Sequence, residues 1–184
     1  MKLLNSHLTL KRRGRRDCIL LSLLNSHQCI PQAIEATYVS WAKAAINASE
    51  QSLKNLPLQR IHGDCHLGNL LDDQGQFVFL DFDDMVMGPC VQDTWLLFSE
   101  ERFWQTPEFF AYEDGYNTLS HFDRTWLNVV PALRALRVIH YSAWVLRRLD
   151  DPAFTQLFAH VKQSKFWEDQ IPTLQQACVP LEAG

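Results

Sequence analysis

The sequence predicts a mainly α-helical protein with a small β inset, an α+β fold, and two observations support this prediction. From Pro31 to residue 55 and again after Pro89, apolar residues recur at spacings of three and four, as they do on one face of a helix. Only the segment between Arg60 and Pro89 contains short alternating runs typical of strands. The 184-residue length and 47% hydrophobic content are enough for a folded core.

The first clear helical pattern begins at Pro31, a residue suited to the first turn of a helix. The apolar positions that follow at helical spacing are Ile34, Tyr38, Trp41, Ala45 and Ala48. Residues 1–27, which include the basic cluster Lys11–Arg16, show no comparable pattern. We therefore expect a divergent head over residues 1–27 and a folded domain over residues 28–184.

The β inset is predicted from two short runs, "LQRIH" (58–62) and "QFVFLDF" (76–82). Between them, "DDQG" (72–75) has the composition of a hairpin turn. In the second run Asp81 follows residues that are apolar on both faces of the strand. We expect Asp81 to end this strand, with its carboxylate at the edge of a core.

After Pro89 the pattern returns to helices that carry most of the aromatic residues, which we expect to fill a helical core. The helices are expected at about residues 90–104, 106–119 and 123–149, with one or two more over residues 151–177.

Composition excludes several classes of function. A formal net charge of −4 gives no electrostatic reason to expect nucleic acid as a partner. Five cysteines without CxxC spacing argue against a disulfide framework and against a zinc ribbon, and fit a reducing cytoplasm. No apolar run approaches the length that crosses a bilayer, so we expect no membrane partner.

The acidic residues of the inset indicate a cation. Carboxylates that lie close together repel one another unless a cation is shared among them, and carboxylates with an asparagine carbonyl suit Mg²⁺. Asn69 lies twelve residues before Asp81 across the predicted turn, so the two can meet at the same end of the hairpin. Asp64, five residues before Asn69, is placed to act as a base that accepts a hydroxyl proton.

The motif "HGDCHLGN" followed by "DFDD" resembles the catalytic and metal loops of the aminoglycoside phosphotransferase and choline kinase-like group, which is related to protein kinases. More narrowly, "RIHGDCHLGNLL", "GPCVQDTWLLF" and "PALRALRVIHYSAWVLRRLDDPAF" are similar to the stress response kinase A family of bacterial serine/threonine protein kinases. The resemblance runs from about residue 28 to the C-terminus. It implies a protein-kinase-like C-terminal lobe that uses ATP and Mg²⁺ to phosphorylate serine or threonine in a protein.

The resemblance also implies roles for individual residues. Asp64 is the proton acceptor, Asp81 is a catalytic residue and Mg²⁺ ligand, and Asn69 is the second Mg²⁺ ligand. His66 lies near the phosphates of ATP, and His62 orients the backbone of the loop. Asp93 supports the loop from the following helix.

Other polar residues are left open by the resemblance. Asp83 and Asp84 either assist the metal or only form hydrogen bonds within their loop. Four arginines match the family's helix, but such residues are more often solvated or ion-paired than bound to substrate. They are Arg134, Arg137, Arg147 and Arg148.

A kinase also needs a glycine-rich strand-turn-strand and a strand lysine to hold the ATP phosphates. Neither pattern is found before Pro31, so we expect that the N-terminal ATP-binding lobe is missing from this chain. We then expect weak ATP binding and little phosphorylation by the chain alone. We also expect an exposed apolar surface that favours self-association.

Three alternatives to a protein kinase are considered. A small-molecule phosphotransferase acting on an amino alcohol or aminoglycoside would carry the same loop, and a truncated remnant would fold the loop without using it. A metal hydrolase with His62, Asp64, Cys65 and His66 as ligands is disfavoured, because neighbouring residues of an extended segment point to opposite faces.

Overall fold

The computed structural model describes residues 30–98 and 101–179. The predicted boundary between head and folded domain lies outside these residues and stays a prediction. Within the described residues two compact units are found: one comprises residues 56–130, and the other combines residues 30–55 with residues 131–179. In the described part of the chain, no helix is both long and apolar enough to cross a membrane. The mainly helical fold with a small β inset is confirmed.

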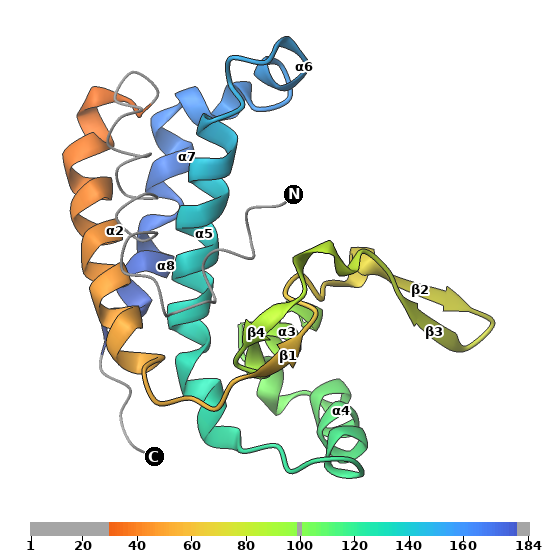
Figure 1. Cartoon of the computed structure of the whole chain (residues 1–184). Helices are drawn as coiled ribbons and strands as arrows, with labels where there is room; N and C mark the ends of the chain where they lie inside the picture. Colours follow the sequence, from red (N-terminus) through yellow and green to blue (C-terminus); the bar gives the residue numbers. More distant parts are fainter. Residues whose placement is uncertain (1–29, 99–100, 180–184) are drawn as a thin grey trace. The chain divides into compact units, whose positions relative to one another are not determined.

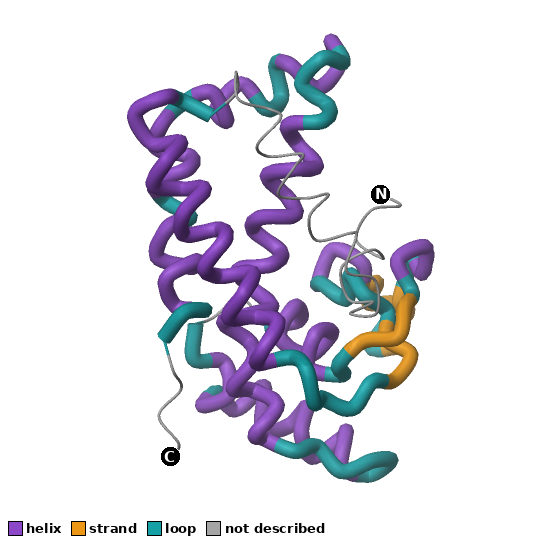
Figure 2. The backbone as a smooth tube through the Cα atoms, turned by 60° about the vertical axis from the view of Figure 1, so that its left-hand side comes forward, coloured by secondary structure: helices purple, strands orange, loops and turns teal. Residues whose placement is uncertain are grey.

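The unit formed by residues 30–55 and 131–179 is a bundle of helices. Its elements are α2 (Gln32–Ser52), α5 (Val130–Leu146), α6 (Pro152–Thr155), η6 (Ala159–Lys162), α7 (Ser164–Glu168) and α8 (Ile171–Gln176). Helix α2 packs against α7 and α8, and the three run side by side in both views (Figures 1 and 2). The helix predicted after Pro31 is therefore confirmed.

Trp167 lies at the centre of this bundle and is fully buried. Its ring meets that of Tyr38 edge-on at 4.7 Å, and its Nε1–H donates to the carbonyl of Val161 at 2.8 Å. The hydroxyls of Tyr38 and Ser142 both donate to Oε1 of Gln170, each at 2.9 Å. The buried polar groups of Trp167, Tyr38 and Ser142 thus have partners, as burial requires.

The helix predicted over residues 123–149 is divided. Residues Arg124–Val129 form a 3₁₀ segment, and the α-helix begins only at Val130. Pro131 explains the division, because it has no N–H to donate to a preceding turn but suits the first turn of a new helix. The side chain of Asp123 caps the 3₁₀ segment by accepting from the N–H of Thr125 at 2.9 Å.

The C-terminal region is also more divided than predicted. Instead of one or two helices it holds three short ones, α6, α7 and α8, with the 3₁₀ segment η6 between α6 and α7. Helices α6 and α8 each carry a proline in their first turn, which limits how far a preceding helix can continue.

The other unit contains the β inset. Strand β1 (Gln59–Ile61) pairs antiparallel with β4 (Val86–Gly88), and β2 (Leu70–Asp73) pairs with β3 (Gln76–Phe79). The β2–β3 pair is the predicted hairpin, and the register places Leu70 opposite Phe79. Gln74 and Gly75 both have positive φ, as expected of the turn that matches the twist of a hairpin.

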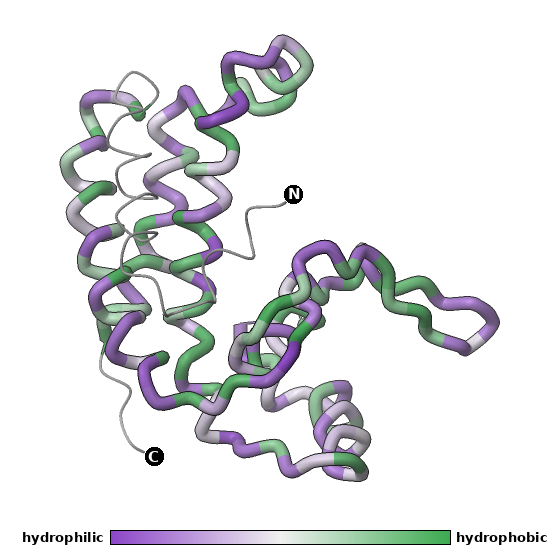
Figure 3. The backbone as a smooth tube through the Cα atoms, in the orientation of Figure 1, coloured by the Kyte–Doolittle hydropathy of each residue, from purple (hydrophilic) through white to green (hydrophobic). Residues whose placement is uncertain are grey.

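The prediction that this hairpin borders a core is wrong. Strand β3 ends at Phe79, two residues before Asp81, and every residue from Leu71 to Asp83 is exposed. The side chain of Phe77 is 64% exposed. Figure 3 shows hydrophobic colouring along both strands and hydrophilic colouring at the turn between them. A two-stranded sheet has too few neighbours to bury such side chains by itself.

Aromatic residues build the core of this unit beside the inset. Phe103, from η4 (Phe103–Gln105), and Phe109, from α4 (Pro107–Asn117), are fully buried and meet edge-on at 5.4 Å. Phe98 lies beyond the end of α3 (Val91–Leu97) and stacks on Phe103 at 5.2 Å. The predicted aromatic helical core is therefore confirmed here.

Candidate active site

The loop between β1 and β2 holds most of the predicted site residues, and its first four residues, His62, Gly63, Asp64 and Cys65, are buried. Gly63 has φ +87°, a conformation that residues with a side chain rarely adopt. A Cβ at this position would lie only 2.3 Å from the carbonyl oxygen of Asp84. The glycine therefore allows the loop to pass directly against the backbone of the segment after β3.

Asp93 in helix α3 holds the start of this loop. One of its carboxylate oxygens accepts from the N–H of His62 at 2.7 Å, and the other accepts from the N–H of Gly63 at 2.9 Å. Burial raises the pKa of Asp93, while these two hydrogen bonds act in the opposite direction because they favour the charged form. The carboxylate thus fixes two consecutive peptide groups just before Asp64.

The side chain of His62 connects the loop to the segment after β3. Its Nε2 lies 2.8 Å from the carbonyl oxygen of Leu80, and its ring contacts that of Phe82 at 4.7 Å. Its Nδ1 accepts from the N–H of Asp64 at 3.4 Å. Since Nδ1 accepts, the ring proton of the neutral imidazole is on Nε2. Nε2 therefore donates a hydrogen bond to the carbonyl of Leu80.

Asn69 lies at the open end of the hairpin. Its carbonyl oxygen accepts from the N–H of Leu80 at 2.8 Å, so it stands opposite the residue that precedes Asp81. Its side-chain Nδ2 donates to the carbonyl of Asp64 at 3.0 Å. The amide oxygen is then the atom of Asn69 suited to a cation. The chain around Asp64, Asn69 and Asp81 is held together by these bonds.

Asp81 has an exposed side chain and a left-handed backbone, with φ 59° and ψ 64°. It directly precedes the 3₁₀ segment η3 (Phe82–Asp84). Non-glycine residues in this region carry strain, and such residues cluster at functional sites. This conformation could not be predicted from the sequence, because no glycine or asparagine marks the position.

His66 lies beside Asp64. Its Nε2 is 3.5 Å from Oδ2 of Asp64, and its Nδ1 accepts from the N–H of Gly68 at 3.0 Å. The proton of a neutral imidazole is then on Nε2, which faces the carboxylate. The Asp64 residue is 7% exposed, so a small part of it remains accessible.

Cys65 follows Asp64 but is unsuited to bind a metal. Burial, and then the charges of Asp93 and Asp64, raise the pKa of its thiol to about 12, so the thiol stays protonated at neutral pH. Over residues 30–98 and 101–179, no three or more His, Cys, Asp or Glu side chains form a group that could hold a metal ion. Both findings weigh against the metal hydrolase considered above.

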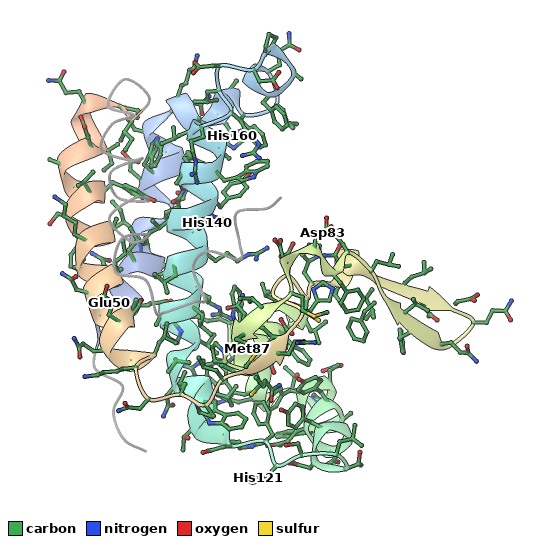
Figure 4. The ribbon with its side chains drawn as sticks, viewed as in Figure 1. Glu50, Asp83, Met87, His121, His140 and His160 are labelled. Atoms are coloured by element: carbon green, nitrogen blue, oxygen red, sulfur yellow. The ribbon has the colours of Figure 1, made fainter. Side chains whose placement is uncertain are left out.

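Asp83 and Asp84, which the sequence did not distinguish, have opposite surroundings. Asp83 is exposed on the segment between β3 and β4, where Figure 4 labels it. Asp84 is only 1% exposed, and neither of its carboxylate oxygens has a hydrogen-bond partner among the described residues. Burial, followed by the charge of Asp64, raises the pKa of Asp84.

Two of the arginines of the predicted family helix follow the end of α5 and contact its last turn. Nε of Arg147 donates to the carbonyl of Ala143 at 3.1 Å. Nη1 of Arg148 donates to the carbonyl of Trp144 at 3.3 Å, and the Arg148 guanidinium lies 4.1 Å from the centre of the Trp144 ring. These contacts are those of a structural role rather than of substrate binding.

Comparison with known proteins places this site in a family. Residues 22–130 match the family model described as APH, phosphotransferase enzyme family. The chain is 34% identical over 145 residues to stress response kinase A of Escherichia coli (strain K12). It is 32% identical over 145 residues to "serine/threonine protein kinase RdoA" of Salmonella typhimurium.

Each of these two alignments covers 78% of the chain but 44% of the relative, so the chain spans less than half the length of these curated relatives. The family model, in contrast, matches more than half of the chain and includes the whole β inset. The chain belongs to the phosphotransferase enzyme family.

Proposed function

We propose that this chain carries the base and the metal ligands of an ATP- and Mg²⁺-dependent serine/threonine protein kinase. In this proposal Asp64 accepts the proton of the attacking hydroxyl, and Asn69 and Asp81 bind Mg²⁺. His66 lies near the ATP phosphates. His62 and Asp93 orient the loop without touching substrate.

The proposed reaction transfers the γ-phosphoryl group of ATP to a serine or threonine hydroxyl. The hydroxyl oxygen forms a bond to the γ-phosphorus while the bond from that phosphorus to the bridging oxygen breaks, which releases ADP. The hydroxyl proton passes to the carboxylate of Asp64. Bound Mg²⁺ would offset the negative charge of the phosphates. Positioning and electrostatic stabilisation supply most of the rate in such reactions.

The observation that supports the proposal most is the hydrogen-bonded link between the base and the metal ligands. The side-chain amide of Asn69 donates a hydrogen bond to the carbonyl of Asp64, and its backbone carbonyl accepts one from the N–H of Leu80. His62 makes a second link, to the carbonyl of Leu80. Both links connect the loop that carries Asp64 with the residue before Asp81.

The names of the relatives support the choice of substrate. One is named a serine/threonine protein kinase and the other a stress response kinase. We therefore propose a protein hydroxyl as acceptor, in preference to an amino alcohol or an aminoglycoside. Such an enzyme would work in the cytoplasm, where ATP is made and where Cys65, Cys90 and Cys178, which are free thiols here, stay reduced.

We also propose that the chain alone binds nucleotide weakly and associates with itself. The relatives are more than twice as long as the region matched, and a kinase holds ATP with a glycine-rich loop and a lysine on a second lobe. The exposed apolar residues of the hairpin provide a surface for self-association. Those above 40% exposure on or next to β2 and β3 are Leu67, Leu71, Phe77, Val78, Phe79, Leu80 and Phe82.

The proposal is tested by incubating the chain with labelled ATP, Mg²⁺ and a generic protein substrate, with an aminoglycoside and an amino alcohol in parallel. We expect a low level of label in the protein, which disappears in Asp64→Asn and persists in Asp73→Asn. Asp73 is the matched control because it is an exposed aspartate on β2.

Other outcomes decide between the alternatives. Label in the small molecule alone favours a small-molecule phosphotransferase. Absence of transfer by the wild-type chain favours a remnant that does not catalyse. A titration with fluorescent nucleotide and Mg²⁺ completes the test, and micromolar affinity would contradict the expectation of weak binding.

A further inference from the structure

Asp93 braces the loop before Asp64 only while helix α3 holds its carboxylate in one orientation. The two oxygens of this carboxylate accept from two different N–H groups, at 2.7 and 2.9 Å, so a small rotation of the helix would lengthen one of these bonds. Helix α3 has only seven residues, and no side-chain hydrogen bond caps its first turn. A helix this short is marginal by itself, so its neighbours must fix its position.

Thr94, the residue after Asp93, provides one contact that fixes the helix. Its side chain is fully buried, and its hydroxyl oxygen shares a hydrogen bond with the hydroxyl of Tyr112 in helix α4, at 3.0 Å. Another hydrogen bond of this hydroxyl, to the carbonyl of Cys90, is longer, at 3.4 Å. The bond to Tyr112 is therefore the better one, and it joins α3 to α4.

Tyr112 is held at this position by an aromatic cluster. Its ring meets the rings of Phe98 and Phe122 edge-on, at 5.6 and 6.4 Å, and lies 6.1 Å from the ring of Phe109. Burial raises the pKa of Tyr112 to about 12, so the hydroxyl stays protonated at neutral pH. The cluster thus presents a neutral hydroxyl to Thr94 and leaves the ring little freedom to turn away.

Tyr116, one turn further along the same face of α4, makes a second connection to the loop. Its hydroxyl has two side-chain hydrogen-bond partners, Gln59 and Cys90, and Cys90 directly precedes α3. Gln59 begins β1, the strand that leads into His62. Helix α4 therefore contacts both segments that support the buried part of the loop, the strand before it and the helix that carries Asp93.

We infer that the hydroxyl of Tyr112 is a positioning group for the proposed catalytic loop. It acts through Thr94, which fixes helix α3 so that Asp93 keeps both of its hydrogen bonds to the loop. In this role Tyr112 contacts neither substrate nor metal. The link from Tyr112 to Asp93 stands on these contacts alone, and only its importance for phosphoryl transfer rests on the proposed role of Asp64.

The test uses variants that remove a hydroxyl and keep the rest of the side chain nearly unchanged in shape. Tyr112→Phe and Thr94→Val each remove one hydroxyl of the pair. Tyr38→Phe is the matched control, because it also removes a buried tyrosine hydroxyl, the one that donates to Gln170 at 2.9 Å in the helical bundle. Urea unfolding establishes that every variant is folded under the conditions of the measurement.

The first readout is the pair of amide proton signals of His62 and Gly63 in the ¹H–¹⁵N NMR spectrum of the full chain. An N–H that donates to a carboxylate at short distance resonates at low field, so these signals report on the bonds to Asp93. They should move to higher field in Tyr112→Phe and in Thr94→Val. The double variant should shift them no further than the larger single change, because both substitutions remove the same hydrogen bond.

The controls separate loss of this hydrogen bond from a general loss of packing or stability. Thr94→Ser keeps the hydroxyl and should keep the wild-type signals of His62 and Gly63, as should Tyr38→Phe. Unchanged signals in Tyr112→Phe would overturn the inference, however much stability the variant loses. An equal shift in Tyr38→Phe would also overturn it, because the loop would then respond to the loss of any buried hydroxyl.

The second readout is the transfer of label from ATP to a generic protein substrate, and it separates this inference from the proposed function. The rate at saturating ATP should fall about tenfold in Tyr112→Phe, with the KM for ATP unchanged. Shifted amide signals with undiminished transfer would contradict a role in positioning for catalysis. Shifted amide signals in a chain whose wild type transfers no label would support the link to Asp93 and contradict the proposed function instead.

Discussion

Two separate reasons require glycine at position 63. Its φ of +87° disfavours any side chain, and its position leaves no room for a Cβ beside the carbonyl of Asp84. Gly75 shares the first requirement with φ +86° but not the second, because nothing lies within 4 Å of the place where its Cβ would be. The two glycines therefore allow the effects of conformation and of contact to be measured apart.

Gly75→Ala is expected to lower the free energy of unfolding by about 1 kcal/mol, because alanine is strained at positive φ. Gly63→Ala is expected to lower it by more, roughly 2–4 kcal/mol, since the loop and the Asp84 backbone must also move apart. Urea unfolding of both variants provides the measurement. Equal losses in the two variants would show that the close contact has no energetic consequence.

Asp93→Asn is expected to destabilise the chain by about 1–3 kcal/mol, because an amide can accept only at its oxygen. One of the two N–H groups of His62 and Gly63 then loses its acceptor. Asp114→Asn, at an exposed position of α4, is the control and should leave stability nearly unchanged. Urea unfolding at neutral pH measures both changes, and a loss no larger than that of the control would refute a bracing role for Asp93.

At the scale of elements, helix α4 is tied to the 3₁₀ segment η5 (Arg124–Val129) by an ion pair. Nε and Nη2 of Arg124 donate to the two carboxylate oxygens of Glu113 at 2.7 and 2.6 Å. The hydrogen bonds from Arg124 lower the pKa of Glu113. Bidentate geometry makes this pair stronger than most, although exposed pairs contribute little in general.

Glu113→Gln is expected to lower stability by less than about 1 kcal/mol at neutral pH. A lowered pKa means that the contribution of Glu113 is present above its ordinary pKa and is lost as pH falls through the lowered value. The difference between wild type and variant should therefore shrink in acid. Unfolding curves across the acidic range measure it, and a difference that grows as pH falls would contradict the assignment.

The β2–β3 hairpin has no buried residue in either strand. It was predicted correctly as a hairpin because "DDQG" specifies its turn and because alternation specifies its strands. Its exposure could not be predicted, because the same alternation fits a strand covered on both faces. Only the elements available to cover a strand decide that question, and sequence patterns do not reveal them.

At the scale of the whole molecule, exposed apolar side chains on the hairpin lead us to expect self-association. Phe77→Thr should reduce it, because threonine preserves strand propensity and removes a ring that is 64% exposed. Leu119→Thr removes an apolar side chain that is 93% exposed outside the hairpin and should have little effect. Sedimentation velocity over a range of concentrations measures both, and equal effects would exclude the hairpin as the contact surface.

The candidate site was predicted from sequence where spacing determines position. Asn69 and Asp81 lie on either side of the β2–β3 hairpin, whose turn was predicted at residues 72–75. The register places Leu70 opposite Phe79, so Asn69 and Asp81 lie at the same open end of the hairpin. The opposite surroundings of Asp83 and Asp84 could not be predicted, because they depend on the contact between Asp84 and Gly63, twenty-one residues earlier in the sequence. The division at Pro131 could have been predicted from the missing N–H of proline.

The left-handed backbone of Asp81 determines how its role can be tested fairly. Alanine at this position would remove the carboxylate and also meet a conformation that it adopts poorly, so a lost activity would have two explanations. Glycine would relax the backbone and change the loop. Asparagine tolerates the left-handed region and has nearly the same shape as aspartate, so Asp81→Asn is the substitution that changes charge alone.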